Sequence, residues 1–261
     1  MRNTPGETEH VLSPVDDAKG LVVFVHGFLD DSTVWAELFE CLDCPDWEFA
    51  AVDLHVTDVE CPEPGAVLEG YRDQALQVVR ERKHGSARPL VIVGHSMGGQ
   101  IAELAALREH DLRGLVLITP APLGGYPMPA EQMEVFRQRA RDKDRVAISR
   151  GKVALSFNIG VRGLKTLVNA TASTPVETSL QQLEAWTAGH PLGAHPSQVK
   201  APTLVVTSDD TFFTAEFLTG HVAPRFTDAG IAHVPEAGHW PHVEQPARLA
   251  EVLTEFLAHI S

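Results

Sequence analysis

At 261 residues the chain is long enough to bury one sizeable hydrophobic core, and α/β folds of this length commonly form a single domain. Hydrophobic residues make up 44% and charged residues 21%, which is typical of a globular protein and excludes a disordered tail. The formal net charge of -14 repels phosphate backbones and anionic lipid, so neither nucleic acid nor a membrane is expected as a partner.

The N-terminal residues 1–7 lack the apolar segment of a signal peptide, and no apolar run approaches transmembrane length. A cytoplasmic location is therefore expected. The three cysteines, an odd number, argue against a disulfide framework. Cys41 and Cys44 form a Cys-x-x-Cys pair, but no second pair or nearby histidine completes four zinc ligands, so neither a metal site nor a redox couple is predicted.

The N-terminal half of the chain alternates strand patterns with helical patterns. The continuous apolar run Leu21–Val25 predicts a strand that is buried on both faces of a parallel sheet. Apolar spacing predicts a helix over Ser32–Leu42, a second strand at Trp47–Val52 and a helix over Val67–Lys83. This alternation predicts a doubly wound, mostly parallel sheet whose ligand site lies beyond the carboxyl ends of the strands.

Residues 90–107 carry the most specific signal of the chain. An apolar, β-branched run ends at Gly94, Ser96 follows, and Gly98 leads into a helical pattern. The sequence Gly-His-Ser-Met-Gly therefore predicts a strand, a tight turn and a helix with Ser96 at the apex. Glycines are needed on both sides because a Cβ would collide with the neighbouring strand or helix, and the helix N-terminus favours negative charge near the serine.

A further strand, Leu115–Thr119, is followed by a loop rich in proline and glycine, and helical spacing then continues to about Trp186. The predicted amphipathic helices of this stretch are Ala130–Arg141, Asp144–Phe157, Leu164–Asn169 and Pro175–Ala188. The sheet resumes with strands at Pro202–Thr207 and near Ile231–Val234, and the last predicted helix is Pro246–His259.

These motifs resemble those of the α/β-hydrolase family, in which the nucleophile elbow Gly-x-Ser-x-Gly lies between a strand and a helix. The resemblance covers the chain from Leu21 to the C-terminal helix. It implies an α/β-hydrolase fold with Ser96 as nucleophile and His239, in a Gly-His loop before the last helix, as base. The family order of serine, acid and histidine implies Asp210 as the acid, with Asp209 as the alternative.

The resemblance also implies an oxyanion hole built from backbone N–H groups, which are fixed before charge develops. The His-Gly-x segment after the first strand assigns one donor to Phe28, and the residue after the nucleophile assigns the other to Met97. His26 itself is expected to be structural. His242 is expected to be a surface residue or a neighbour of the site.

Residues 120–198 lie where the family inserts a helical lid over its active site. The implied division is a hydrolase core of residues 1–119 and 199–261 with this lid inserted. The side chains expected to contact substrate are Met128, Phe136, Trp186 and Trp240, with Met133 and Phe157 as further candidates. For the candidates within the lid, packing inside the lid itself is an equal alternative.

The implied activity is hydrolysis of a carboxylic ester, lactone or thioester of a small, fairly apolar substrate through an acyl-Ser96 intermediate, without a cofactor. A carbon–carbon bond hydrolase and a cofactor-free peroxidase of the same fold are alternatives. A non-catalytic protein that binds a small ligand and keeps the triad is another. Epoxide hydrolases and haloalkane dehalogenases are excluded because they use a carboxylate nucleophile. A homodimer is compatible with the sequence, which does not define the oligomeric state.

Overall fold

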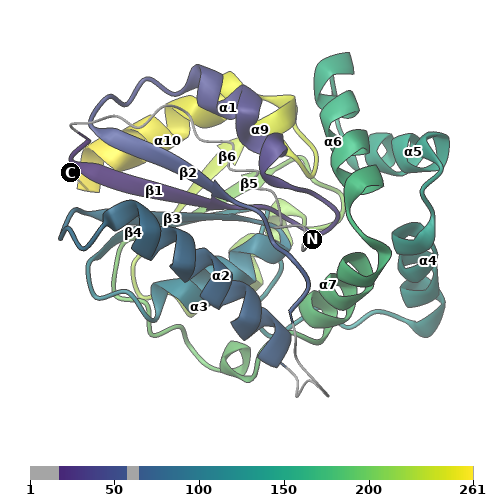
Figure 1. Cartoon of the computed structure of the whole chain (residues 1–261), viewed down its shortest axis with the longest axis horizontal. Coiled ribbons are helices and arrows are strands. Elements are labelled where there is room, and N and C mark those ends of the chain that lie inside the picture. Colours follow the sequence, from purple (N-terminus) through teal and green to yellow (C-terminus); the bar gives the residue numbers. More distant parts are fainter. Residues whose placement is uncertain (1–17, 58–64, 261) are drawn as a thin grey trace, which may run out of the picture.

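The computed structural model describes residues 18–57 and 65–260, so the N-terminal residues 1–7, where no signal peptide is predicted, lie outside the described residues. The described residues form a parallel sheet with the strand order β2-β1-β3-β4-β5-β6 (Figure 1). Its strands are β1 (Gly20–Val25), β2 (Trp47–Val52), β3 (Leu90–His95), β4 (Leu112–Ile118), β5 (Thr203–Ser208) and β6 (Ala229–Val234). The predicted doubly wound parallel sheet is confirmed.

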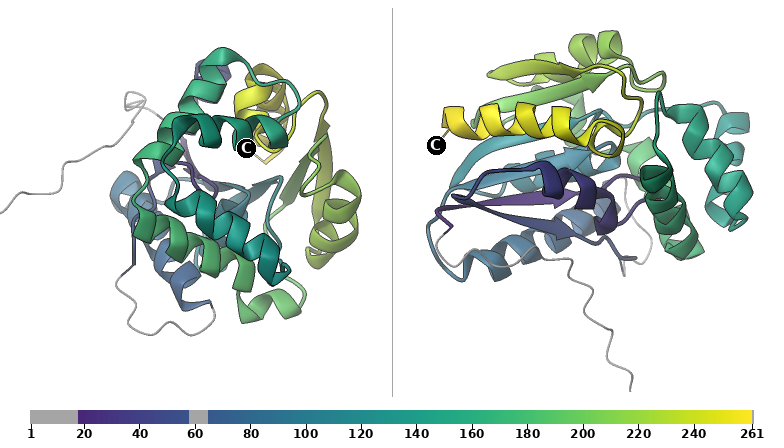
Figure 2. Two further views of the ribbon diagram at one scale, coloured as in Figure 1. Left: turned by 90° about the vertical axis from the view of Figure 1, so that its right-hand side faces the viewer. Right: turned by 90° about the horizontal axis from the view of Figure 1, so that it is seen from above.

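Helices cover both faces of the sheet (Figures 1 and 2). The helices α2 (Ala66–Lys83) and α3 (Met97–Ala106) pack together on one face, and α1 (Ala36–Cys41) and α10 (Pro246–Ile260) pack together on the other. The short helical elements are η1 (Ser32–Trp35), η2 (Pro191–Ala194), α8 (Ala215–Phe217), η3 (Leu218–Val222), η4 (Ala223–Arg225) and α9 (Pro241–Glu244). The predicted helix Ser32–Leu42 thus begins as the 3₁₀ helix η1 and continues as α1.

Alternate residues of β1 belong to two hydrophobic cores. Leu21 and Val23 pack in the core on the side of α2 and α3, whereas Val22 and Phe24 pack in the core on the side of α1 and α10. None of these side chains is more than 1% exposed. A strand that is covered on both faces has no position at which a polar side chain would meet water, which explains the uninterrupted apolar run.

Between β4 and β5 the chain leaves the sheet and forms α4 (Ala130–Arg141), α5 (Arg145–Leu155), α6 (Val161–Ser173) and α7 (Val176–Ala188). These four helices, here called the four-helix segment, stand beside the sheet at the right of Figure 1 and face the viewer in the left view of Figure 2. The predicted helix Ala130–Arg141 coincides with α4. Helix α6 is longer than the predicted Leu164–Asn169, because buried Gly163 and Ala170 extend its packed face.

Close backbone approaches attach the end of α7 to the loop after β4. The N–H of Tyr126 donates to the carbonyl of Thr187 (3.0 Å), and the N–H of His190 donates to the carbonyl of Leu123 (2.7 Å). Gly189 has φ of 73°, and a Cβ on it would overlap the backbone of the facing loop. Glycine is therefore required where the two segments meet.

Cys41 and Cys44 are both free thiols, the first exposed and the second partly buried. In the part of the chain that the structure describes, no helix combines the length and the apolar character needed to cross a bilayer.

Candidate active site

The turn between β3 and α3 holds Ser96 in a conformation that few non-glycine residues adopt, with φ of 52° and ψ of -121°. Two glycines make this turn sterically feasible. A Cβ on Gly94 would overlap the carbonyl of Gly98, and a Cβ on Gly98 would overlap the carbonyl of Val25 in β1. The predicted strand, turn and helix are therefore present, and Ser96 lies at the start of α3, where the helix dipole favours negative charge.

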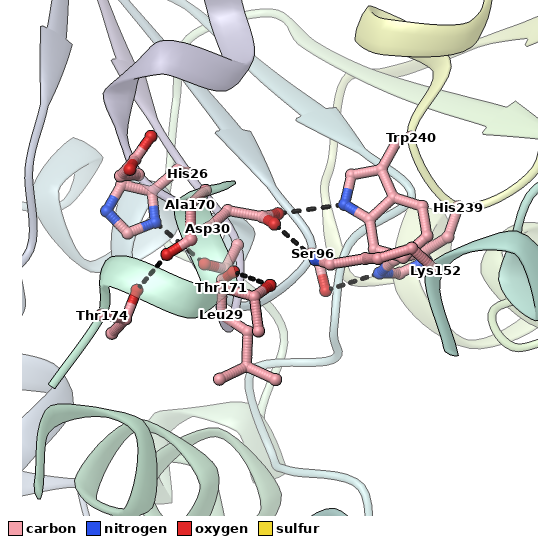
Figure 3. Close-up of polar contacts among 12 residues, drawn as sticks. His26, Leu29, Asp30, Ser96, Lys152, Ala170, Thr171, Thr174, His239 and Trp240 are labelled. Carbon is pink, nitrogen blue, oxygen red and sulfur yellow. Dashed lines mark hydrogen bonds and ion pairs between the residues drawn. The ribbon is translucent and has the colours of Figure 1, made fainter. Parts of the chain in front are cut away.

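A chain of hydrogen bonds connects Ser96 to Asp210. The Nε2 atom of His239 lies 3.0 Å from the Oγ of Ser96 (Figure 3), and its Nδ1 atom lies 2.7 Å from the Oδ2 of Asp210. Since a carboxylate only accepts hydrogen bonds, Nδ1 carries the proton, and Nε2 is free to accept from the serine hydroxyl. All three residues are less than 9% exposed. Motifs that are 143 and 29 residues apart thus meet at one site.

The surroundings of Asp210 keep it ionised. Burial raises the pKa of Asp210, but the attraction of His239 and the backbone N–H groups of Phe212 and Phe213 hold that pKa below its ordinary value. Asp209 lies elsewhere. Its carboxylate accepts the N–H of Glu236 (2.8 Å) and is turned away from His239. Of the two predicted acids, the structure brings only Asp210 to the histidine.

The backbone of His239 is held from several sides. Its carbonyl accepts hydrogen bonds from His95 Nε2 (2.7 Å) and Thr119 Oγ1 (3.1 Å), and its N–H donates to the carbonyl of Leu155 in α5 (2.9 Å). Burial lowers the pKa of His95 to about 3, so its ring is neutral and donates through Nε2. The fold therefore fixes the position of His239 from β3, β4 and the four-helix segment.

His242 is fully buried, so the expectation of a surface position is wrong, while that of a neighbour of the site is met. Its ring packs between Trp35 and His95, at centroid distances of 4.4 and 4.5 Å. Neither ring nitrogen has a hydrogen-bond partner among the residues that the structure describes, and burial lowers the pKa of His242 well below its ordinary value. His242 lies in α9, and all four residues of that helix are buried.

The loop after β1 passes directly beside the serine. His26 Nε2 accepts the N–H of Leu54 (3.1 Å), as suits the structural role expected of this histidine. A Cβ on Gly27 would lie 3.1 Å from the Cβ of Ser96, so the following residue, Phe28, is adjacent to the site. Met97 is the first residue of α3, and the first N–H groups of a helix have no acceptor within it.

A cavity of about 110 Å³ opens on Ser96 and His239 between the sheet and the four-helix segment. Of the predicted substrate contacts, Phe136, Trp186 and Trp240 line it. Met128 and Met133 do not line it, although both pack, like Phe136, against the core on the side of α2 and α3. Phe157 is 60% exposed and is not one of the residues that line the cavity.

Sequence reasoning missed several residues in and beside this cavity. Phe212 and Phe213 lie 6.3 and 5.9 Å from the ring of His239, and their position directly after Asp210 could have indicated them. Asp30 and Lys152 form a buried ion pair (Figure 3), for which the sequence offers no local signal. Among the described residues, no group of three or more His, Cys, Asp or Glu side chains is placed to hold a metal ion.

The parallel sheet and the strained serine turn define the class of this protein. The sequence matches the Alpha/beta hydrolase family over residues 22–252, and the chain belongs to that family. It is 24% identical to 2-hydroxy-6-oxononadienedioate/2-hydroxy-6-oxononatrienedioate hydrolase from Burkholderia vietnamiensis, over 90% of this chain and 86% of that protein. It is also 27% identical to sn-1-specific diacylglycerol lipase from Mus musculus, over 65% of this chain and 59% of that protein.

Solved structures share the fold at lower sequence identity. An esterase from Exiguobacterium antarcticum superposes with a TM-score of 0.76 at 16% identity, covering 93% of both chains. A bromoperoxidase from Bacillus anthracis superposes with a TM-score of 0.74 at 17% identity, covering 92% of both chains. Because these two proteins bear different activity names, the likeness establishes the fold and not the reaction.

Proposed function

We propose that this protein is a serine hydrolase that cleaves an ester, lactone or thioester of a small, fairly apolar substrate through an acyl-Ser96 intermediate. The observation that carries the proposal is the hydrogen-bond chain from Ser96 through His239 to Asp210 at the wall of a cavity. A serine hydroxyl is a weak nucleophile unless a base removes its proton, and this arrangement supplies the base and the group that orients it.

In the first half of the reaction, His239 Nε2 accepts the proton of Ser96 as Oγ attacks the carbonyl carbon. Asp210 holds the imidazole in the required tautomer and stabilises the imidazolium that forms. The proton then passes from His239 to the leaving group, and the bond between carbonyl carbon and leaving group breaks. In the second half His239 takes a proton from water as the water oxygen attacks the acyl carbon. The bond to Ser96 Oγ then breaks, His239 returns the proton to Oγ, and the carboxylic acid leaves.

The backbone N–H groups of Phe28 and Met97 are the proposed donors to the tetrahedral oxyanion. Both residues adjoin Ser96, one in the loop after β1 and the other in the first turn of α3. Donors of this kind act without reorganising when the negative charge develops, and loss of one costs roughly 3 to 4 kcal/mol of transition-state stabilisation in well-studied enzymes.

We assign residues 120–198 as a lid over a hydrolase core formed by the rest of the chain. Support comes from the cavity, which has Ser96 and His239 on one side and side chains of α4, α5 and α7 on the other. Phe28, Phe136 and Trp186 are aromatic members of the lining, with ring centroids 6.2 to 6.4 Å apart. Aromatic walls favour an apolar acyl or alcohol group.

The test uses p-nitrophenyl esters of graded acyl length and a fluorophosphonate probe. The wild-type protein is expected to turn over one or more esters many times and to be labelled at Ser96. Ser96→Ala should lower kcat by at least about 1,000-fold and abolish labelling, because the nucleophile is lost. Ligand binding without turnover or labelling in the wild-type protein would refute the hydrolase and favour a binding protein.

A second candidate, hydrolysis of a carbon–carbon bond next to a ketone, is favoured by the match to the Burkholderia vietnamiensis hydrolase, which covers 90% of this chain. The same nucleophile and base would serve that reaction. Adding a ring-cleavage keto acid and its ester analogue to the substrate panel distinguishes the two. Cleavage of the keto acid with no turnover of any ester, lactone or thioester would replace the first proposal by the second.

A further inference from the structure

A buried ion pair lies at the wall of the cavity. The Nζ atom of Lys152 is 2.7 Å from the Oδ1 of Asp30, and the two side chains are 7% and 1% exposed. The indole N–H of Trp240 donates to the Oδ2 of Asp30 (3.0 Å), and Nζ of Lys152 lies 4.5 Å from the centre of the Trp240 ring (Figure 3). Three side chains thus form one polar cluster, here called the Asp30 cluster.

The Asp30 cluster joins three segments that the proposed reaction needs. Asp30 follows Phe28 by two residues in the loop after β1, and Lys152 belongs to α5 of the four-helix segment. Trp240 directly follows His239, and their ring centroids are 5.0 Å apart. A buried ion pair contributes little net stability because desolvation of two charges offsets their attraction. Stability alone therefore gives little reason to place these charges here.

Helix α5 also supports the backbone around His239. Its last residue, Leu155, accepts the N–H of His239 (2.9 Å), and Gly238 packs so closely on that carbonyl that a Cβ would overlap it. The N–H of Phe157, just after α5, donates to Glu244 (2.7 Å), which also accepts the N–H of Trp240 (3.2 Å). The end of α5 and the loop that carries the base are therefore a single packed unit.

Charged groups approach the ring of His239 from several elements. Asp210 comes from the turn after β5, and Glu244 comes from α9, where backbone N–H groups bind its carboxylate. Within residues 18–57 and 65–260, the other titratable groups near the site are the neutral His95 and His242, the paired Asp30 and Lys152, and, at the cavity wall, Arg139 and Asp142. Asp30 and Lys152 cancel each other only while both are present.

We propose that Asp30 and Lys152 are positioning residues for the catalytic base. Together they hold Trp240 and α5 against His239, and their opposite charges offset each other's electrostatic effect on its imidazole. This inference rests on the proposed function, since it gives His239 the role of base. Loss of Lys152 leaves the Asp30 carboxylate, which stabilises the imidazolium. Loss of Asp30 leaves the Lys152 ammonium, which destabilises it.

The test compares Lys152→Met, Asp30→Asn and the double variant, with kcat and KM for a p-nitrophenyl ester measured from pH 5 to 9. The acid limb of kcat/KM is expected to move to higher pH by about one unit in Lys152→Met and to lower pH by about one unit in Asp30→Asn. In the double variant the limb should return toward the wild-type position. Each single variant should lose roughly tenfold in kcat, with a smaller change in KM.

Two further variants separate positioning from folding. Lys152→Arg keeps the positive charge and should leave the acid limb of kcat/KM at the wild-type pH. If Lys152→Met does not fold, Lys152→Arg and Asp30→Asn are compared instead. Lys143→Met is the matched control, because Lys143 lies in the same segment but donates to the carbonyls of Thr171 and Thr174. It should change neither the limb nor kcat.

An acid limb that stays in place in both charge variants, or moves in the same direction in both, overturns the inference. A rise in KM alone would instead make Lys152 a substrate-binding residue and also overturn it. Fluorophosphonate labelling of Ser96 in the wild-type protein separates this failure from failure of the proposed function. With labelling, only the role of the Asp30 cluster is lost; without labelling or turnover, the hydrolase proposal fails first.

Discussion

Asp209 and Asp210 are neighbours in sequence, yet their surroundings give them different chemistry. Asp210 is 3% exposed and bonds to the ring of His239 and to the N–H of Phe212 (2.8 Å). Asp209 faces the outer side of the same turn, where it bonds to the N–H of Glu236 and lies 3.5 Å from the ring of His233. Only the buried carboxylate can orient the base, so charge alone does not define the acid.

Replacing each of these aspartates by asparagine separates their roles. Asp210→Asn should lower kcat by at least about 100-fold, because an amide can hold the imidazole in the wrong tautomer and cannot stabilise the imidazolium. Asp209→Asn should change kcat by less than about threefold, since it alters a turn outside the cavity. Ester turnover and melting temperature are measured for both variants. A larger loss in Asp209→Asn would show that the turn rearranges in the working enzyme.

Residues of the site differ in how well the sequence predicts them. Ser96 and His239 each lie in a short motif whose glycines are needed by local backbone geometry, so each motif can be recognised by itself. That the two meet across 143 residues is implied by the resemblance to the α/β-hydrolase family and not by either motif alone. Asp30 and Lys152 are 122 residues apart, and each has an ordinary sequence context. Their pairing depends on the position of α5 relative to the loop after β1, which no local sequence pattern specifies. The direction of Met128 likewise depends on tertiary packing, so its contact with substrate stays a prediction.

At the scale of whole elements, the sequence predicts what periodicity controls. The sequence locates the inner strands β1 and β3 to within a residue because they are apolar on both faces. It locates α4 and α7 because an amphipathic pattern continues across several turns. The limits of α6 were underestimated, since Gly163 and the threonines near its end weaken the helical pattern. The way the four helices lie over the sheet depends on contacts between distant loops.

Substitution of Gly189, which packs on the loop after β4, tests whether this contact attaches the four-helix segment to the sheet. Gly189→Ala should lower the free energy of unfolding by about 1 to 3 kcal/mol, because it needs a positive φ and adds a Cβ where backbone already lies. It should also speed proteolytic cleavage between α7 and β5. Gly160→Ala is the control, because a Cβ there meets no atom within 4 Å.

Urea unfolding of the two variants, with limited proteolysis read by mass spectrometry, provides the measurement. Equal stability of Gly189→Ala and the wild-type protein would mean that the loop and the end of α7 separate freely. In that case the four-helix segment would be attached mainly through α5, by the hydrogen bond between His239 and Leu155 and by the Asp30 cluster.

For the molecule as a whole, the site lies between the sheet and the four-helix segment, and buried titratable groups support it from the α1 side. His95 and His242 pack against each other beneath the base with no access to solvent. Both are neutral in the folded protein. In the unfolded chain each would titrate like an ordinary histidine, near pH 6.5. Protonation of His95 and His242 is therefore coupled to unfolding of the protein.

This coupling predicts how stability changes with pH. The pKa of His95 is lowered to about 3 in the folded protein, so between about pH 6.5 and pH 3 the unfolded chain binds a proton that the folded protein does not. Stability is consequently lost as the pH falls through that window. The loss from His95 alone between pH 7 and pH 5 should be about 2 kcal/mol, and His242 adds to it in the same direction.

Urea unfolding at pH 7 and pH 5 measures this loss in the wild-type protein and in His242→Phe, which keeps an aromatic ring against Trp35. The variant should lose less stability than the wild-type protein over the same interval, because one of the two buried imidazoles is gone. His259→Gln, at the exposed end of α10, is the control and should lose as much as the wild-type protein. An equal loss in His242→Phe would mean that His242 takes up its proton without unfolding of the protein. The uncharged ring of His242 would then be present beneath the base only above the pH at which it takes up this proton.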